Sequence, residues 1–342
     1  MPILKSLTSL FLLALVFAAP VPASADSVED FYKGKTLTLV LGYSPGGGYD
    51  ANARVLARYW GKFIPGHPNV IVQNMPGAGS LLAANYMYNK AATDGTMLGM
   101  FASQAALEPM FGNPEARFDP TKFTWIGSMS QEVVYCGLWQ SPSAPASFDD
   151  LLTKESIFGT TGPTGITYQH PAILKNVLGA KIKMVSGYTG SRDVTLAMER
   201  GEVNGMCALF SSSIKAQYSN DVNSGKLKLV IQMGSKRSDE FGKIPSVYDY
   251  AKTDEERAVL DVHFKQLLLS RPFAGPPTIP ADRLKALRDS FQATLKDPEF
   301  LAEAKQAGLD IEYVSHEQVE DLFKQYAGFS PDVFRKAAAA MQ

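Results

Sequence analysis

The stretch TLTLVLGYSPGGGYD, Thr36–Asp50, decides the fold of this chain. Thr36–Leu41 is a nearly continuous apolar run, which is typical of a parallel strand covered on both faces. The glycine-rich segment Ser44–Gly48 then turns the chain, and Asp50 opens a helix whose apolar residues lie on one side. A strand, a tight turn and an amphipathic helix in this order predict an α/β fold.

The same theme recurs along the chain. Further strands are predicted at Val70–Val72, Thr96–Ala102, Tyr135–Trp139, Ile157–Thr161, Lys181–Val185, Val203–Leu209, Leu227–Met233 and Phe264–Ser270. Ser80 and Ser191 are predicted helix N-caps, helices begin at Pro280 and Pro298, and Ser315 and Gln318 form a capping box. Strands that alternate with helices predict mostly parallel sheets joined by right-handed crossovers.

The N-terminus resembles an export signal. Residues 1–25 combine a basic start, an apolar run over Leu7–Ala19 and the small-residue pattern Ala23-Ser24-Ala25, as signal peptides do. The run is too short for a span of about 20 residues, and no cysteine follows it closely. We therefore expect a periplasmic protein that is not lipid-anchored.

The length and net charge of the chain indicate its number of domains and the kinds of partner it can have. The 342 residues suit two domains of about 150 residues each. A net charge of −1 gives no basic excess, which disfavours a nucleic-acid partner. We predict lobe 1 over residues 26–132 plus about 234–300, lobe 2 over 133–233, and C-terminal helices over 301–342 that pack on the lobes.

The chain has two cysteines, Cys136 and Cys207. They form no metal-ligand motif, so no metal is expected, and both fall in predicted strands of lobe 2. In an oxidising compartment they form either one disulfide or two separate small buried residues; the sequence leaves both open.

The sequence partly matches two motifs, the nucleophile motif of hydrolases and a dinucleotide-binding pattern. Gly42–Gly46 matches G-x-S-x-G, but the residue after Ser44 is Pro45, which has no N–H for an oxyanion hole. The glycines at 46 and 48 also fit a loose dinucleotide pattern, although the acid about 20 positions later is missing. The four histidines, His67, His170, His263 and His316, lack partners at catalytic spacing and are interpreted as structural or exposed. We therefore expect no enzyme activity and no cofactor; a periplasmic hydrolase is the weaker alternative.

Four glycine-rich turns follow strands, at Gly46–Gly48, Gly77–Gly79, Gly162–Gly165 and Gly187–Gly190. Backbone N–H groups at such turns, with the positive end of the following helix, hold anions. In open α/β sheets ligands lie beyond the carboxyl ends of strands, where these turns are. The turns therefore predict a carboxylate site in a cleft between two lobes that close by a hinge.

Seven motifs follow one another along the chain: Ser44–Asp50, Asn74–Ser80, Asp94–Thr96, Gly187–Gly190, Gly201–Asn204, Gly225–Leu227 and Phe273–Pro277. In these motifs and in their order the chain resembles the substrate-binding proteins of tripartite tricarboxylate transporters, the Bug or TctC-like family. The resemblance implies a two-lobed periplasmic-binding-protein fold of the Venus flytrap, type II-like kind. It also implies capture of a small di- or tricarboxylate or aromatic acid, and delivery to the integral-membrane permease of such a transporter.

The family often has Pro-Tyr-Lys-Gly where Gly187–Gly190 stands, so the resemblance implies the role and not the identity of the acid. We expect a monomer; a receptor for another transporter or for a sensor system is the alternative. The candidate ligand-binding residues are Tyr43, Ser44, Gly46, Gly47, Gly48, Asp50, Gly79, Ser80, Ser103, Gln104, Gly162, Thr164, Gly165, Tyr168, Tyr188, Thr189 and Ser191.

Overall fold

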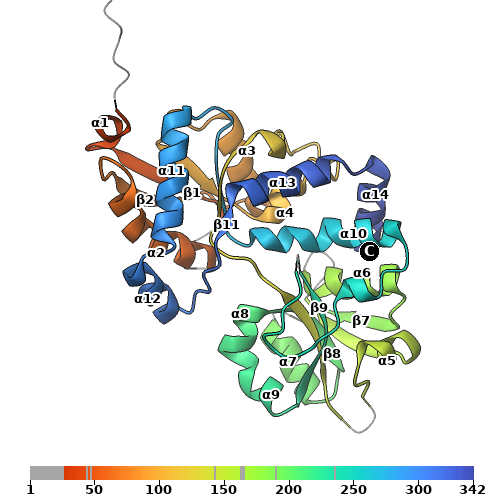
Figure 1. The fold of residues 1–342 in the computed structure, drawn as a ribbon. Coiled ribbons are helices and arrows are strands. Elements are labelled where there is room, and N and C mark those ends of the chain that lie inside the picture. The colour runs from red at the N-terminus through yellow and green to blue at the C-terminus, as the bar shows by residue number, and fades with distance from the viewer. Residues whose placement is uncertain are drawn as a thin grey trace, which may run out of the picture.

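The computed structural model describes residues 27–43, 45–46, 48–141, 144–161, 166–188, 191–234 and 236–342. The predicted signal peptide lies outside these residues. Two separate sheets organise the described chain, and Figure 1 shows the first at the upper left and the second below it. The two-lobed α/β fold that the sequence predicts is confirmed by these sheets and by the structural comparisons given below.

Within the described residues the first sheet has six strands in the order β11-β4-β10-β3-β1-β2. Their bounds are β1 Thr36–Leu41, β2 Asn69–Asn74, β3 Met97–Met100, β4 Thr124–Ser128, β10 Pro272–Gly275 and β11 Val314–Ser315. β1 pairs in parallel with β2 and β3, whereas β10 is antiparallel to β3 and β4. β10, which comes late in the sequence, thus lies in a sheet whose first strands come from the N-terminal part of the chain.

The second sheet has five strands in the described chain, ordered β7-β6-β8-β5-β9. They are β5 Val134–Trp139, β6 Ser156–Thr160, β7 Ile182–Ser186, β8 Gly205–Phe210 and β9 Leu227–Met233. β6 pairs in parallel with β7 and β8, but β5 is antiparallel to both β8 and β9. Both sheets are therefore mixed, rather than mostly parallel as the alternation of strands and helices predicts.

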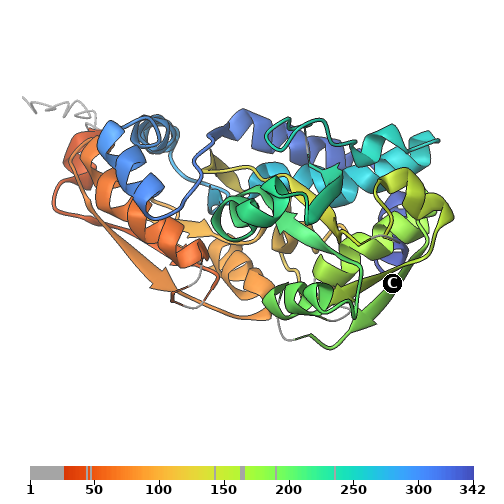
Figure 2. The same cartoon turned by 90° about the horizontal axis from the view of Figure 1, so that it is seen from below.

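Helices cover the sheets and connect them. The α-helices of five or more residues are α1 Val28–Tyr32, α2 Gly48–Phe63, α3 Leu81–Asn89, α4 Ser103–Leu107, α5 Phe148–Thr153, α6 Ile166–Leu178, α7 Ser191–Glu199, α9 Ser219–Asn223, α10 Asp254–Phe264, α11 Ala281–Thr294, α12 Pro298–Gln306, α13 His316–Ala327 and α14 Pro331–Ala340. Short turns of helix are η1 Ala78–Ser80, η2 Pro120–Lys122, α8 Ser211–Ser213, η3 Ile214–Tyr218, η4 Val247–Asp249 and η5 Lys265–Leu269. Figure 2 shows that these helices lie around both halves of an elongated molecule.

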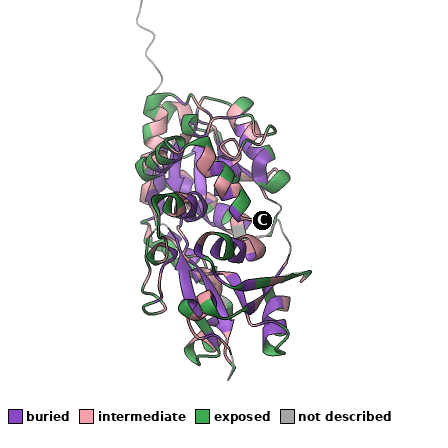
Figure 3. Cartoon of the chain, turned by 90° about the vertical axis from the view of Figure 1, so that its right-hand side faces the viewer, coloured by how far each residue is buried: buried purple, intermediate pink, exposed green. Residues whose placement is uncertain are grey.

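β1 is buried on both of its faces, as its apolar run predicts. Leu39 and Leu41 pack in one core cluster with Leu56 and Trp60 of α2, while Val40 belongs to a second cluster on the other face. Figure 3 shows the strands mainly in the colour of buried residues, with exposed residues on the outer helices. This burial fixes where β1 ends and thus where its turn emerges.

The predicted strand Phe264–Ser270 is wrong. Phe264 ends α10, and Lys265–Leu269 continues as a 3-10 helix. Thr253 and Glu256 form a capping box that starts α10, and the apolar residues after it are buried as helix rather than as strand. A short apolar run does not distinguish the two by itself.

Cys136 and Cys207 lie on the paired strands β5 and β8 and form a disulfide in the structure. At the other end of the chain, α13 packs on β4, where the rings of Phe323 and Trp125 stack with centroids 4.8 Å apart. α14 packs against α10 and α6. The last helix therefore packs against α6, which lies on the second sheet, and against α10.

Candidate functional site

Two chain segments run side by side where the sheets meet. The residues after β4 bond to those before β10: Met129 N–H donates to the Arg271 carbonyl at 3.0 Å, and Glu132 N–H donates to the Leu267 carbonyl at 3.0 Å. Ser270 N–H donates back to the Ser130 carbonyl at 3.1 Å. We call these paired segments, 128–132 and 267–271, the crossing segments. They link the two sheets and place side chains between them.

A cavity of about 740 Å³ opens beside the crossing segments, a size typical of small-molecule sites, which span roughly 300–1,000 Å³. From the first-sheet side it is lined by Tyr43, Tyr49, Gly79, Ala102, Ser103, Gln104, Glu108 and Phe111. From the second-sheet side it is lined by Ile166, Gln169, His170, Ile173, Phe210, Ser212 and Ser213. The remaining lining residues are Glu132, His263, Gln266, Leu267, Ser270, Arg271, Ala338 and Met341.

Arg271 supplies a positive charge to this cavity. Its guanidinium carbon lies 4.3 Å from the centre of the Tyr49 ring, and its Nη1 donates to the Ser270 carbonyl at 2.6 Å. Its Nε is buried and has no hydrogen-bond partner, and no carboxylate of the described chain forms an ion pair with it. Stacking on a tyrosine fixes the plane of the guanidinium. Arg271 is therefore a positioned cation with donor capacity left over.

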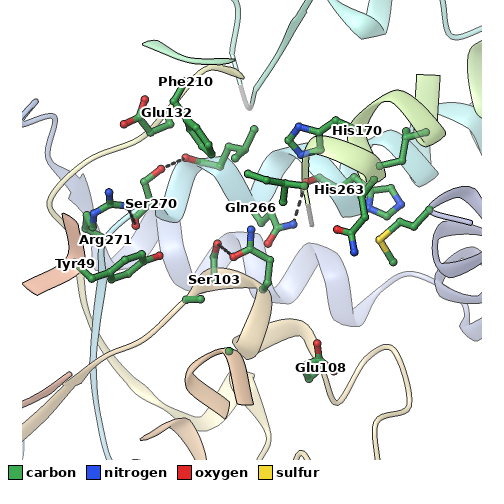
Figure 4. A pocket seen from close by; sticks show the side chains of 18 of the residues that line it. Tyr49, Ser103, Glu108, Glu132, His170, Phe210, His263, Gln266, Ser270 and Arg271 are labelled. Atoms are coloured by element: carbon green, nitrogen blue, oxygen red, sulfur yellow. Dashed lines mark hydrogen bonds between the residues drawn. The ribbon is translucent and has the colours of Figure 1, made fainter. Parts of the chain in front are cut away.

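Tyr49 remains a neutral phenol beside this cation. Burial raises the pKa of Tyr49 to about 12, although the Arg271 charge acts in the opposite direction. Tyr43 lies against the Tyr49 ring, with the two ring centres 4.4 Å apart. Figure 4 shows Tyr49 next to the Arg271 guanidinium, and Tyr43 and Tyr49 together form an aromatic wall of the cavity.

Glu132 lies on a crossing segment and is buried. Its Oε1 accepts a hydrogen bond of 2.9 Å from the Ser212 hydroxyl, which follows β8. Burial raises the pKa of the Glu132 carboxyl, and the Ser212 bond and Arg271 charge offset this only in part. The residue ties the crossing segment to the second sheet at the edge of the cavity.

Asp50 organises the glycine-rich turn instead of lining the cavity. It is 4% exposed; Arg54 Nε and Gly46 N–H both donate to its Oδ2, at 2.8 and 2.9 Å, and Asn74 Nδ2 donates to its Oδ1 at 2.9 Å. The Arg54 bond, with those from Gly46 and Asn74, lowers the pKa of Asp50 to about 2. The Gly46 amide is thus used inside the turn, so the turn's order comes from an acid at the start of α2.

Asn74 extends this network to the cavity wall. Its Nδ2 also donates to the Tyr43 carbonyl at 2.9 Å. The end of β2 and the start of α2 therefore hold Tyr43 and Tyr49 together through Asn74 and Asp50. In this chain Asp50 acts on the site through the residues it orders.

The predicted N-cap at Ser80 is wrong. Ser80 has a left-handed backbone with φ of 71° and makes no side-chain cap to α3. Its hydroxyl accepts from Ala102 N–H at 2.9 Å and donates to the Gly79 carbonyl at 2.6 Å. Ser80 therefore joins the turn before α3 to the end of β3, and it leaves Gly79 to face the cavity.

The other predicted site residues divide into three groups. Ser103 and Gln104 begin α4 and line the cavity with Tyr43 and Gly79. Among the described residues, the cavity lining leaves out Gly46, Asp50, Ser80, Tyr168, Tyr188 and Ser191. Gly48 begins α2, and the predicted residues Ser44, Gly47, Gly162, Thr164, Gly165 and Thr189 lie outside the described residues.

Sequence reasoning missed several lining residues. Arg271 follows the segment Phe264–Ser270, which the sequence predicts to be a strand. From the sequence, His170 and His263 are interpreted as structural or exposed histidines. Both histidines are in fact buried and line the cavity. No local sequence pattern marks Arg271, because it is the pairing of Pro272–Gly275 with the first sheet that brings this residue to the cavity. The described residues hold no group of three or more His, Cys, Asp or Glu side chains suited to a metal ion, and none of their helices is both long and apolar enough to cross a bilayer.

A family model described as "Tripartite tricarboxylate transporter family receptor" matches residues 53–328. The chain belongs to this family. Members of this family are receptors and not enzymes. This protein, called the receptor from here on, is therefore a binding protein, as its sequence predicts. The near-match to a hydrolase motif at Gly42–Gly46 therefore carries no catalysis.

Known relatives are similar to the receptor over almost its whole length. A Cupriavidus necator protein, "UPF0065 protein in gbd 5'region", is 26% identical over 95% of this chain and 91% of its own length. The crystal structure of a TctC solute-binding protein from Polaromonas superposes with a TM-score of 0.69 at 17% identity, covering 89% of this chain and 99% of that one. MatC from Rhodopseudomonas palustris, solved with bound malate, gives a TM-score of 0.55 at 18% identity, covering 90% and 99%. The two structures establish the shared fold.

Proposed function

We propose that this receptor works in the periplasm, where it captures a small carboxylate between its two lobes and delivers it to the permease of a tripartite tricarboxylate-type transporter. The observation that carries this proposal is Arg271, a positioned guanidinium that faces the cavity and lacks a carboxylate partner within the described chain. A guanidinium binds a carboxylate with two parallel hydrogen bonds. An anionic ligand fits this unmet donor capacity better than a neutral one does.

The magnitudes are sufficient for useful affinity. Hydrogen bonds to a charged group contribute about 1.5–3 kcal/mol each, and micromolar binding corresponds to a net free energy of about −8 kcal/mol, so the contacts must also offset the ordering costs. Two bonds from Arg271, with contacts to Ser103 and Gln104 at the start of α4, reach that range. Burial of the ligand body against Tyr43 and Tyr49 adds to it.

Closure of the lobes follows from how they are joined. The crossing segments are short, and the ion pairs that bridge the two sides are exposed: Lys215 with Asp310, and Lys236 with Glu312, each at 2.6 Å. Exposed pairs contribute only about 0–1 kcal/mol each, so they permit a hinge motion. A ligand that contacts both sides then favours the closed form.

The proposed periplasmic location and the proposed permease partner are supported by other observations. Residues 1–25 have the order of a signal peptide, and the family description names a transporter receptor. MatC, which shares the fold, was solved with malate. These observations support export and a carboxylate cargo, and a transporter permease as the partner.

The test is isothermal titration calorimetry of the mature receptor against a panel of organic acids and neutral sugars. The Arg271→Met variant is expected to lose roughly 30- to 150-fold in affinity for the best acid, since a lost charged partner costs about 2–3 kcal/mol. Arg117→Met is the matched control, because the Arg117 side chain is 72% exposed and Arg117 is not among the residues that line the cavity. Binding of sugars without binding of any acid, or unchanged affinity in Arg271→Met, would contradict the proposal.

A further inference from the structure

The cavity has two chemically different ends. Figure 4 shows Arg271 and Tyr49 at one end, and His170 and His263 at the other. The second end also carries Phe111, whose ring lies against that of His263. We call it the histidine end. A ligand whose carboxylate binds Arg271 extends its body towards this end.

The histidine end does not suit a second carboxylate. Burial lowers the pKa of His170 to about 3 and that of His263 to about 4, so both imidazoles are neutral at physiological pH. Glu108 is an acidic side chain of the lining, not a basic one, and its Oε2 accepts from Asn113 Nδ2 at 2.7 Å. Among the described lining residues, Arg271 is thus the one side chain with a fixed positive charge.

Two polar atoms at the histidine end lack partners. Gln266 is 9% exposed and His170 is 6% exposed, yet Gln266 Oε1 and His170 Nδ1 make no hydrogen bond. The Gln266 amide is oriented by its own Nε2, which donates to the His263 carbonyl at 3.0 Å. Gln266 Oε1 is therefore left as a buried acceptor. Such an unmade bond is costly, and a ligand hydroxyl can donate to it.

Aromatic and sulfur groups surround these two atoms. The His263 ring stacks on Phe111 with centroids 6.5 Å apart, and Met341 is among the residues that line the cavity. Flat rings pack favourably against such faces, and thioethers make favourable contacts with aromatic edges. The walls favour a planar apolar body over a short polar chain.

We infer that the ligand is an aromatic monocarboxylate with a hydroxyl group at the end opposite its carboxylate. Its carboxylate binds Arg271, its ring lies between the aromatic walls, and its hydroxyl donates to Gln266 Oε1 beside His170. This inference rests on the proposed function, since it takes the Arg271 end as the carboxylate site. It narrows the ligand class from carboxylates in general to one kind of carboxylate.

The test compares four probes by calorimetry with the wild-type receptor: 4-hydroxycinnamate, cinnamate, malate and adipate. We expect 4-hydroxycinnamate to bind tightest, about tenfold more tightly than cinnamate, as one satisfied buried hydrogen bond predicts. In Gln266→Met this preference should disappear, so that the ratio of the two affinities falls to about one. Gln325→Met is the matched control, because Gln325 is exposed on α13, and it should retain the full preference.

His170→Phe is the second variant and does not depend on how Gln266→Met folds; it should also lower the preference for the hydroxylated acid. Tighter binding of malate or adipate than of both aromatic acids would overturn the inference and leave the proposed function standing. Equal affinity of the wild type for cinnamate and 4-hydroxycinnamate would overturn it as well. Failure of every acid in the wider panel to bind would instead overturn the proposed function.

Discussion

Asp50 offers the sharpest test of how the glycine-rich turn is held. Its carboxylate accepts from Gly46 N–H, Arg54 Nε and Asn74 Nδ2. Asp50→Asn keeps the shape of the side chain but removes its charge, and it places an NH₂ group where donors already point. We expect the turn and the start of α2 to lose stability without a change of fold.

The magnitude follows from the carboxyl's pKa. The bond from Arg54, with those from Gly46 and Asn74, lowers the Asp50 pKa from 3.8 to about 2, and one unit corresponds to about 1.4 kcal/mol. The charged form of Asp50 thus stabilises the folded receptor by about 2 kcal/mol at neutral pH. Because the folded pKa is the lower one, this contribution is complete above the unfolded pKa and is lost as the pH falls towards 2.

The assay is urea unfolding followed by tryptophan fluorescence, with Trp60 of α2 as a nearby reporter. At pH 7 the variant should be about 2 kcal/mol less stable than the wild type, and the difference should shrink as the pH is lowered from 4 to 2.5. Asp239→Asn, at an exposed position, is the control and should cost little at either pH. A cost that is the same at both pH values would show that shape and not charge holds the turn, and would refute this reasoning.

Two further predictions concern the second lobe and the cavity. Reducing the bond between Cys136 and Cys207, which are 71 residues apart, should lower the free energy of unfolding by about 4 kcal/mol on the chain-entropy estimate; thermal melts with and without reductant measure this, and a Cys136→Ala/Cys207→Ala variant should not respond to reductant. His263 has a pKa lowered by burial to about 4, so the unfolded chain binds its proton first and stability should fall as the pH drops from about 6.5 towards 5. His263→Gln should reduce that slope by up to about 1.4 kcal/mol per pH unit, and an unchanged slope in urea unfolding would contradict a buried neutral imidazole.

The sequence by itself determined the elements that local patterns specify. The apolar run Thr36–Leu41 is a strand because both of its faces are buried, and the capping box at Ser315 starts α13 as its side chains dictate. The resemblance carried by an ordered set of short motifs, from Ser44–Asp50 to Phe273–Pro277, was enough to indicate the receptor family. These features depend on neighbouring residues, which a sequence displays directly.

The tertiary structure alone decided which side chains share the cavity. Arg271 and Tyr49 are 222 positions apart, and only the insertion of β10 beside β3 and β4 brings the guanidinium over the ring. No local pattern reveals that His170 and His263 are buried, nor that the Gly46 amide is already used by Asp50. Contacts between distant segments depend on how the sheets assemble, because that assembly determines which polar groups are paired and which remain available for a ligand.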